Sequence, residues 1–115
     1  MHRRIFVLAL LIFSPLQLMA SSCPNAVPTH CAKFCETFRT AAKCHCTSSG
    51  LPQGMCSDVK LLYKRLITTF GTLERTCEFQ RDTTKENCID SWHCYLNGGV
   101  NADGKPCNDN GNPCV

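Results

Sequence analysis

SDVKLLYKRLITTFGTLERTC, residues 57–77, is the clearest periodic stretch of the chain and decides its fold. Its apolar residues recur at the spacing of one helix face; they are Val59, Leu62, Tyr63, Leu66, Ile67, Phe70 and Leu73. Ser57 or Asp58 can cap the start of such a helix, and Gly71 weakens it by about 1 kcal/mol relative to alanine. The stretch therefore predicts an amphipathic helix over about residues 57–76.

Two cysteines extend this apolar stripe, Cys56 before it and Cys77 at its end. A continuous helix of about 20 residues spans about 30 Å, whereas the two Cα atoms of a disulfide lie within about 7 Å of each other. We therefore predict that Cys56 and Cys77 do not pair with each other. At least one of them is expected to tie this helix to an earlier one, through Cys31 or Cys35.

The earlier helix is predicted over about residues 29–42. Its apolar residues also fall on one face, and they are Cys31, Phe34, Cys35, Phe38, Ala41 and Ala42. Thr29 follows Pro28 and is the expected N-cap. Residues 44–54 contain serine, proline and glycine, so they are predicted to form a connector between the two helices.

The amino-acid composition of the chain changes after Cys77. Polar turn-forming residues separate the later cysteines, as in Asn97-Gly98-Gly99 and Asp103-Gly104. Such residues favour successive tight turns with, at most, short β structure. This segment has too few apolar residues for a core of its own, so disulfides are expected to hold it together.

The chain begins with a pattern typical of a secretory signal peptide, assigned to residues 1–22. Arg3 and Arg4 precede an apolar run over residues 5–13, and small residues follow. That run is too short to span a bilayer as a helix, and no later stretch reaches the ~18 apolar residues that a span requires. We therefore expect a secreted, extracellular protein without a membrane span.

Residues 23–115 hold all eleven cysteines, which is about 12% of that segment. This density in a short secreted chain predicts a disulfide scaffold, because a small core offsets little of the ordering entropy. The expected fold is one small, disulfide-rich, mainly α domain, with two helices in about 23–77 and a turn-rich, cysteine-rich tail over about 78–115. The disulfide candidates are Cys23, Cys31, Cys35, Cys44, Cys46, Cys56, Cys77, Cys88, Cys94, Cys107 and Cys114.

The odd number of cysteines leaves one without an intramolecular partner. That thiol is either free or available for a disulfide-linked dimer. Without Arg3 and Arg4, ten Lys and Arg stand against nine Asp and Glu, a net charge of +1. So small a charge gives no basis for nucleic-acid binding.

No motif for catalysis or for a cofactor is recognised in the chain. Cys44-His45-Cys46 offers zinc-type ligands, but no CxxC pair accompanies it, and secretion favours disulfides over thiolates. The histidines at 30, 45 and 93 and the aspartates at 58, 82 and 90 fit no hydrolase signature. We therefore predict a non-enzymatic protein with no metal and no cofactor.

The tail carries the one resemblance to a known family. Asp103-Gly104-Lys105-Pro106-Cys107, followed after six residues by Cys114-Val115, resembles the DGxPC…CV motif of the cysteine-rich region of ADAMTS-type metalloproteases. It also resembles tick salivary secreted proteins of the ixostatin type, which lack a protease domain. The similarity covers about residues 88–115. The family's usual CxxxC before this motif is missing, and so is a cysteine after CV, so Cys114, or the residue whose partner it takes, is the expected unpaired cysteine.

The resemblance implies a salivary effector that binds a host extracellular protein and modulates haemostasis or immunity. The shared motif is structural, so no functional residue is carried over. Two alternatives remain open, a venom-type toxin or cysteine-rich ligand of a receptor or channel, and a secreted carrier of a small ligand. Trp92, His93 and Tyr95 are the candidate partner contacts, since aromatic residues dominate interface hot spots. Trp92 can equally fill the small core.

Overall fold

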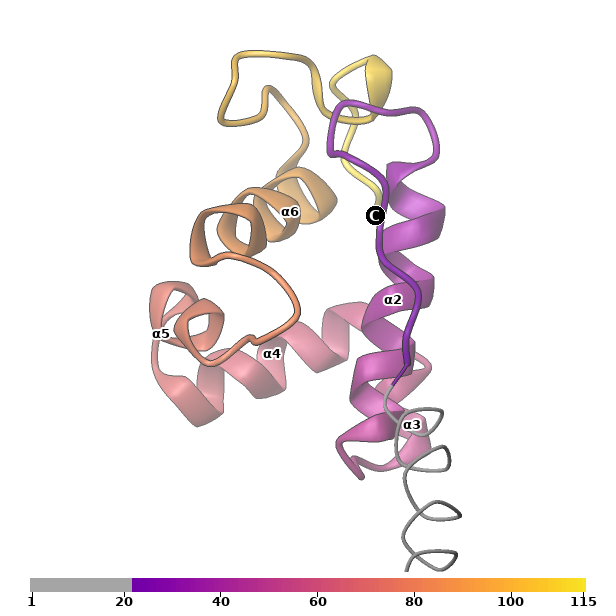
Figure 1. The fold of residues 1–115 in the computed structure, drawn as a ribbon, viewed down its shortest axis with the longest axis vertical. Coiled ribbons are helices and arrows are strands. Elements are labelled where there is room, and N and C mark those ends of the chain that lie inside the picture. The colour runs from indigo at the N-terminus through magenta and orange to yellow at the C-terminus, as the bar shows by residue number, and fades with distance from the viewer. Residues whose placement is uncertain (1–21) are drawn as a thin grey trace, which may run out of the picture.

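The computed structural model of the protein describes residues 22–115. The predicted signal peptide, residues 1–22, lies outside these described residues except for Ser22. The described chain is a small, disulfide-rich, mainly α fold, as predicted (Figure 1). Its elements are α2 (Phe34–Ser48), α3 (Gln53–Cys56), α4 (Val59–Phe70), α5 (Leu73–Glu78), α6 (Lys85–Asn97) and the 3-10 turn η1 (Cys107–Asp109). Within residues 22–115, β structure is limited to one isolated bridge between Val100 and Pro106.

The predicted long helix is present but is broken into two. Asp58 caps α4, with Oδ1 accepting from the backbone N–H groups of Lys60 at 3.0 Å and Leu61 at 3.2 Å. The break falls at Gly71, which adopts φ +91° and ends α4. Thr72 then caps α5 by accepting from the N–H of Arg75. One continuous helix over 57–76 is therefore wrong, because glycine takes a left-handed conformation there that reverses the chain.

The first helix lies later in the chain than predicted. Residues 29–33 form turns, and α2 begins at Phe34. Thr29 is not an N-cap, because its carbonyl accepts from the N–H of Asn108 at 2.9 Å and its hydroxyl donates to Asp90 at 3.2 Å. At its other end α2 continues through Cys44-His45-Cys46 to Ser48, and the rest of the predicted connector contains α3.

α6 lies in the segment predicted to be a turn-rich tail, where no helix was expected. Thr84 caps it, with its hydroxyl oxygen accepting from the N–H of Asn87 at 3.1 Å. Cys88, Trp92 and Tyr95 follow at helical spacing and are all buried. This stripe is a helix signal that the cysteine and turn content of the neighbouring sequence concealed.

Aromatic side chains from three helices form the core. Phe38 of α2 lies 4.9 Å from Trp92 and 5.1 Å from Tyr95 of α6, between ring centroids. Tyr63 of α4 also lies 5.2 Å from Trp92, between ring centroids. The buried Tyr95 hydroxyl accepts from Arg39 Nε at 3.3 Å, so its polar group is satisfied. Trp92 therefore occupies the core, the second of the two roles open to it.

Five disulfides join the described cysteines, and Cys31 is the one left free. The pairs are Cys23–Cys44, Cys35–Cys114, Cys46–Cys56, Cys77–Cys88 and Cys94–Cys107. The prediction that Cys56 and Cys77 do not pair with each other is confirmed. The prediction that one of them pairs with Cys31 or Cys35 is wrong, because α2 reaches Cys46 and α6 brings Cys88 beside α5. Cys114 is paired, so the unpaired cysteine is not Cys114.

None of the helices between residues 22 and 115 has the length and apolar character needed to cross a membrane.

Candidate functional site

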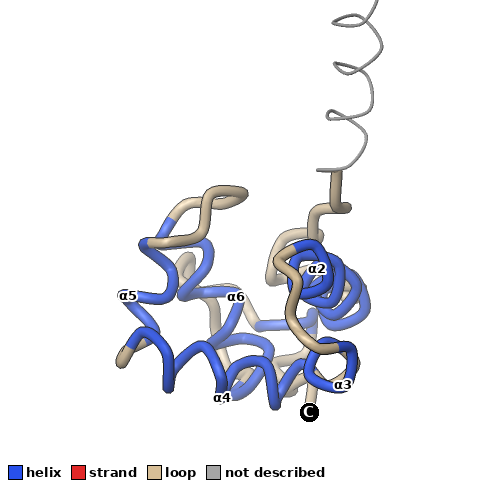
Figure 2. Tube along the Cα trace, turned by 90° about the horizontal axis from the view of Figure 1, so that it is seen from below, coloured by secondary structure: helices blue, strands red, loops and turns tan. Residues whose placement is uncertain are grey.

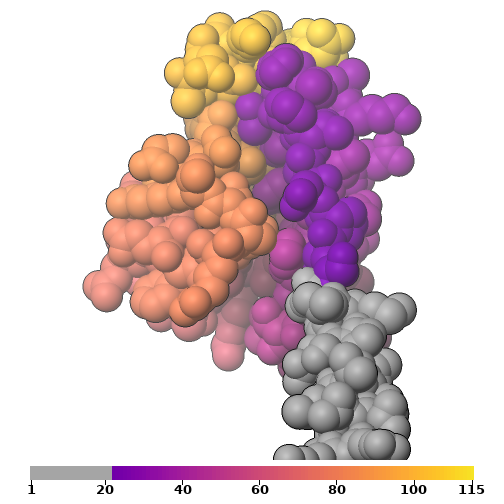
Figure 3. Space-filling view, in the orientation of Figure 1, coloured from indigo at the N-terminus to yellow at the C-terminus, as the bar shows by residue number. Residues whose placement is uncertain are grey.

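A cleft of about 560 Å³ lies between α2 and α6. The N-terminal segment, residues 24–30, and α2 line one side, and α6 with the loop 80–83 lines the other. Figure 2 shows α4 joining the two sides, and Figure 3 shows a furrow between the indigo N-terminal segment and the orange α5–α6 region. A volume of this size lies within the range of small-molecule sites.

The base of the cleft is apolar. Leu62 and Leu66 contribute from α4, Phe38 and Ala42 from α2, and Trp92 from α6. These residues are the inward edge of the same helix stripes that build the two core clusters. The base of the cleft is therefore apolar because it is formed by the edge of the hydrophobic core, beyond which α2 and α6 do not pack against each other.

One end of the cleft is built from a hydrogen-bonded network around Asp90. Its Oδ2 accepts from the Thr29 hydroxyl at 3.2 Å, and its Oδ1 accepts from the N–H of Ala102 at 2.9 Å. Buried Asn101 donates to Thr29 Oγ1 at 3.1 Å and accepts from the N–H groups of Asp103 and Lys105. The network fixes the N-terminal segment, α6 and the tail loop in one arrangement, and it places Asp103 on the cleft lining.

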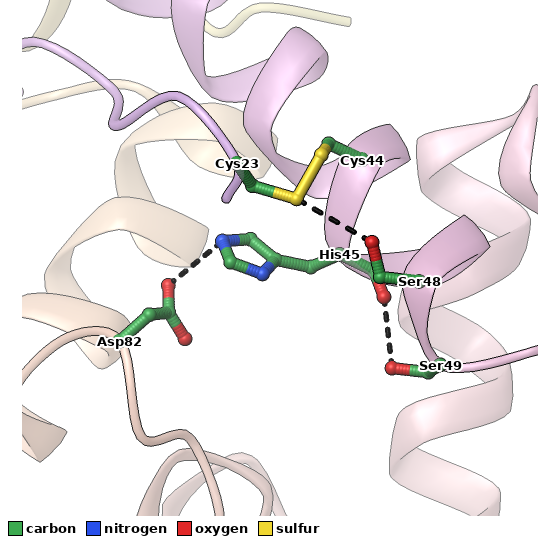
Figure 4. A network of polar contacts seen from close by, with 6 residues as sticks. All are labelled: Cys23, Cys44, His45, Ser48, Ser49 and Asp82. Atoms are coloured by element: carbon green, nitrogen blue, oxygen red, sulfur yellow. Dashed lines mark hydrogen bonds and ion pairs between the residues drawn. A yellow bond between two sulfur atoms is a disulfide. The ribbon is translucent and has the colours of Figure 1, made fainter. Parts of the chain in front are cut away.

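His45 and Asp82 bridge the cleft near its other end (Figure 4). His45 Nε2 of α2 lies 3.2 Å from Asp82 Oδ2 in the loop before α6, and both side chains are more than one-third exposed. Both ends of that loop are joined by Cys77–Cys88. The pair is therefore a polar contact between the two walls at a solvent-accessible rim.

Within residues 22–115, no hydroxyl group is hydrogen-bonded to the imidazole of His45. Ser49 donates to the His45 backbone carbonyl at 2.8 Å, and Ser48 Oγ lies 3.6 Å from Cys23 Sγ (Figure 4). Cys44 and Cys46, considered above as zinc ligands, are both in disulfides. Within residues 22–115, no three His, Cys, Asp or Glu side chains are grouped as a metal would need.

The three predicted partner contacts lie in different environments. Trp92 and Tyr95 are buried, with 5% and 2% of their surface exposed, whereas His93 is exposed. His93 borders a second, shallower groove on the opposite face of α6. Ile89, Leu96 and the exposed Val100 line that outer groove. Of the three, only His93 is presented to solvent as a partner would require.

Four of the residues that line the cleft were considered from the sequence as possible catalytic groups, without a recognisable frame; they are His30, His45, Asp82 and Asp90. Asn101 and Asp103 were missed as a pair, because their role depends on Thr29 and Asp90, which are distant in sequence. No family model matches the chain, and neither does any curated protein or solved structure.

Proposed function

We propose that the chain is a secreted, non-enzymatic binding protein whose cleft between α2 and α6 takes up a small ligand with an apolar body. The observation that carries the proposal is the cleft of about 560 Å³ with an apolar base and polar groups at its rim. Small-molecule sites combine these features, with apolar walls giving affinity and a few polar groups fixing orientation. The five disulfides fit the oxidising compartment that secretion implies.

Disulfides also hold the walls of the cleft in place before any ligand arrives. Cys23–Cys44 fastens the N-terminal segment to α2, Cys46–Cys56 fastens α2 to α3, and Cys77–Cys88 closes the loop that carries Asp82. A site that is already formed loses less conformational entropy on binding. The disulfides therefore lower the entropy cost of binding a ligand in the cleft.

The test uses the full chain expressed in secreting eukaryotic cells, with the product collected from the medium. Trp92 is the single tryptophan of the chain and lines both the cleft and the outer groove. Its fluorescence therefore reports binding at either place, and a variant in the cleft assigns the site. Titration with decan-1-ol is expected to change this fluorescence with saturation. Ser91→Phe, which places a ring in the cleft from α6, is expected to abolish the change.

The matched control is Thr68→Phe, which adds the same ring to an exposed position on α4 that lines neither the cleft nor the outer groove. It is expected to leave the titration unchanged. Equal titrations for the two variants would show that the probe binds elsewhere. Absence of the product from the medium would contradict secretion, and absence of saturable binding by the native protein would contradict the carrier function.

The outer groove supports a second candidate function, binding of a host extracellular protein. It combines exposed His93 with Ile89, Leu96 and Val100, and Val100 has 56% of its surface exposed. A protein captured from vertebrate plasma by the native protein, and lost on Val100→Asp, would support this function. Capture that survives Val100→Asp would argue against the groove. The salivary-effector role implied by the tail's resemblance stays a prediction.

A further inference from the structure

The charges that line the cleft differ from those of the whole chain. Ten Lys and Arg and nine Asp and Glu are spread over residues 23–115. In the described structure three aspartates line the cleft, Asp82, Asp90 and Asp103, but no lysine or arginine does. With histidines counted as neutral, a nearly neutral chain therefore presents three negative charges and no positive one beside an apolar base.

From this distribution we infer that the ligand of the cleft carries a positive charge on its apolar body, as a protonated alkyl or aryl amine does. The inference rests on the proposed carrier function and names the chemical class of its ligand. Carboxylates beside a low-dielectric surface attract a cation more strongly than they would in open water. The same carboxylates disfavour a fatty-acid-like anion of equal size.

The Asp90–Asp103 end is where the structure offers the cation a place. Each Asp90 oxygen accepts one hydrogen bond, from Thr29 or from Ala102, so the carboxylate is held in place and keeps further acceptor capacity. Asp103 is exposed, and its backbone N–H donates to Asn101, which fixes its position in the turn. At the other end Asp82 is already engaged by His45.

A matched series of ten-carbon probes tests the charge of the ligand, with Trp92 fluorescence as the readout. Decylamine, decan-1-ol and decanoate share the apolar chain and differ in the charge of the head group. Decylamine is expected to bind about tenfold more tightly than decan-1-ol, the scale of one charge-assisted hydrogen bond. Decanoate is expected to bind more weakly than either, and added salt is expected to weaken decylamine binding alone.

Asp103→Asn is the decisive variant, because the Asp103 carboxylate makes no hydrogen bond in the described structure and its loss leaves the Asn101 network intact. It is expected to weaken decylamine binding about two- to fivefold, the scale of one exposed charge contact, and to leave decan-1-ol binding unchanged. Asp109→Asn, an exposed aspartate outside the cleft, is the control and is expected to change neither.

The outcomes separate this inference from the carrier function. If decan-1-ol or decanoate binds as tightly as decylamine, the cationic ligand is refuted while the carrier function stands. If none of the three probes gives saturable binding, the carrier function itself fails. Equal loss of amine and alcohol binding in Asp103→Asn would show a structural effect and would also refute a charge contact.

Discussion

The helical region and the C-terminal tail are held together by different physics. In α2, α4 and α6, apolar and aromatic side chains share the burial, so each contributes one part of a continuous core. In residues 98–115, backbone conformation, amide side chains and two disulfides set the path. The stability of the helical region is therefore distributed over many apolar contacts. The stability of the tail depends on a few backbone conformations, amide hydrogen bonds and two disulfides.

Gly98 is a position in the tail that has no room for a side chain. It has φ +69°, and a Cβ added there would lie 2.6 Å from Gly111 O and from Pro113 N. The C-terminal segment lies against the end of α6, where Cys114 N–H donates to the Tyr95 carbonyl at 2.8 Å. Asn108 also holds a positive φ, +58°, while its side chain donates to the Asn112 carbonyl at 2.7 Å.

The largest effect is expected from the disulfides, since loop closure in the unfolded chain grows with loop length. Replacing both Cys35 and Cys114 by alanine opens a separation of 79 residues, and about 4.5 kcal/mol of unfolding free energy is expected to be lost. Replacing Cys46 and Cys56 opens a separation of 10, with about 2.7 kcal/mol lost. Denaturant unfolding measures the free energy lost in each variant. A larger loss for the Cys46 and Cys56 variant than for the Cys35 and Cys114 variant would contradict the loop-length argument.

The next effect is at Gly98. Gly98→Ala is expected to cost roughly 3 kcal/mol or more, because it adds backbone strain to a contact with backbone atoms that cannot rotate away. Gly99→Ala is the matched control, with a positive φ of +81° but nothing within 4 Å of the added Cβ. It is expected to cost about 1–2 kcal/mol, from the left-handed conformation alone. Equal thermal shifts for the two variants would contradict the steric argument.

The smallest effects compare the loss of side-chain hydrogen bonds in the tail with a change of side-chain shape in the helical core. Asn101→Ala is expected to cost about 2–3 kcal/mol, because it removes the partners of Thr29, Asp103 and Lys105. Leu62→Met, at a buried α4 position, is expected to cost less than about 1.5 kcal/mol, since it keeps the volume of the core. Chemical denaturation gives both values, and a Leu62→Met loss as large as that of Asn101→Ala would erase the distinction between the regions.

Local signals were sufficient where an element depends on its own sequence. The apolar stripe and the Asp58 cap gave α4 its start and its buried face, and the cysteine density indicated a disulfide-rich fold. The same kind of signal was present for α6 in Cys88, Trp92 and Tyr95 but was interpreted as tail. At Gly71 the choice between a weakened helix and a reversal was not local, because Leu73 and the buried Cys77 reach the core only after the turn.

The sequence by itself determined a small, mainly α, disulfide-rich chain, whereas the absence of a Cys56–Cys77 pair was predicted from a continuous helix that the structure does not contain. Only the tertiary structure decided which cysteines pair, that Cys31 is left free, and that Asp90 and Asp103 border an apolar cleft with no basic residue. The physical reason is the separation along the chain over which each interaction acts. Helix periodicity and capping act over a few neighbouring residues, whereas a disulfide, a buried amide network or a cleft requires atoms that only packing brings within bonding distance.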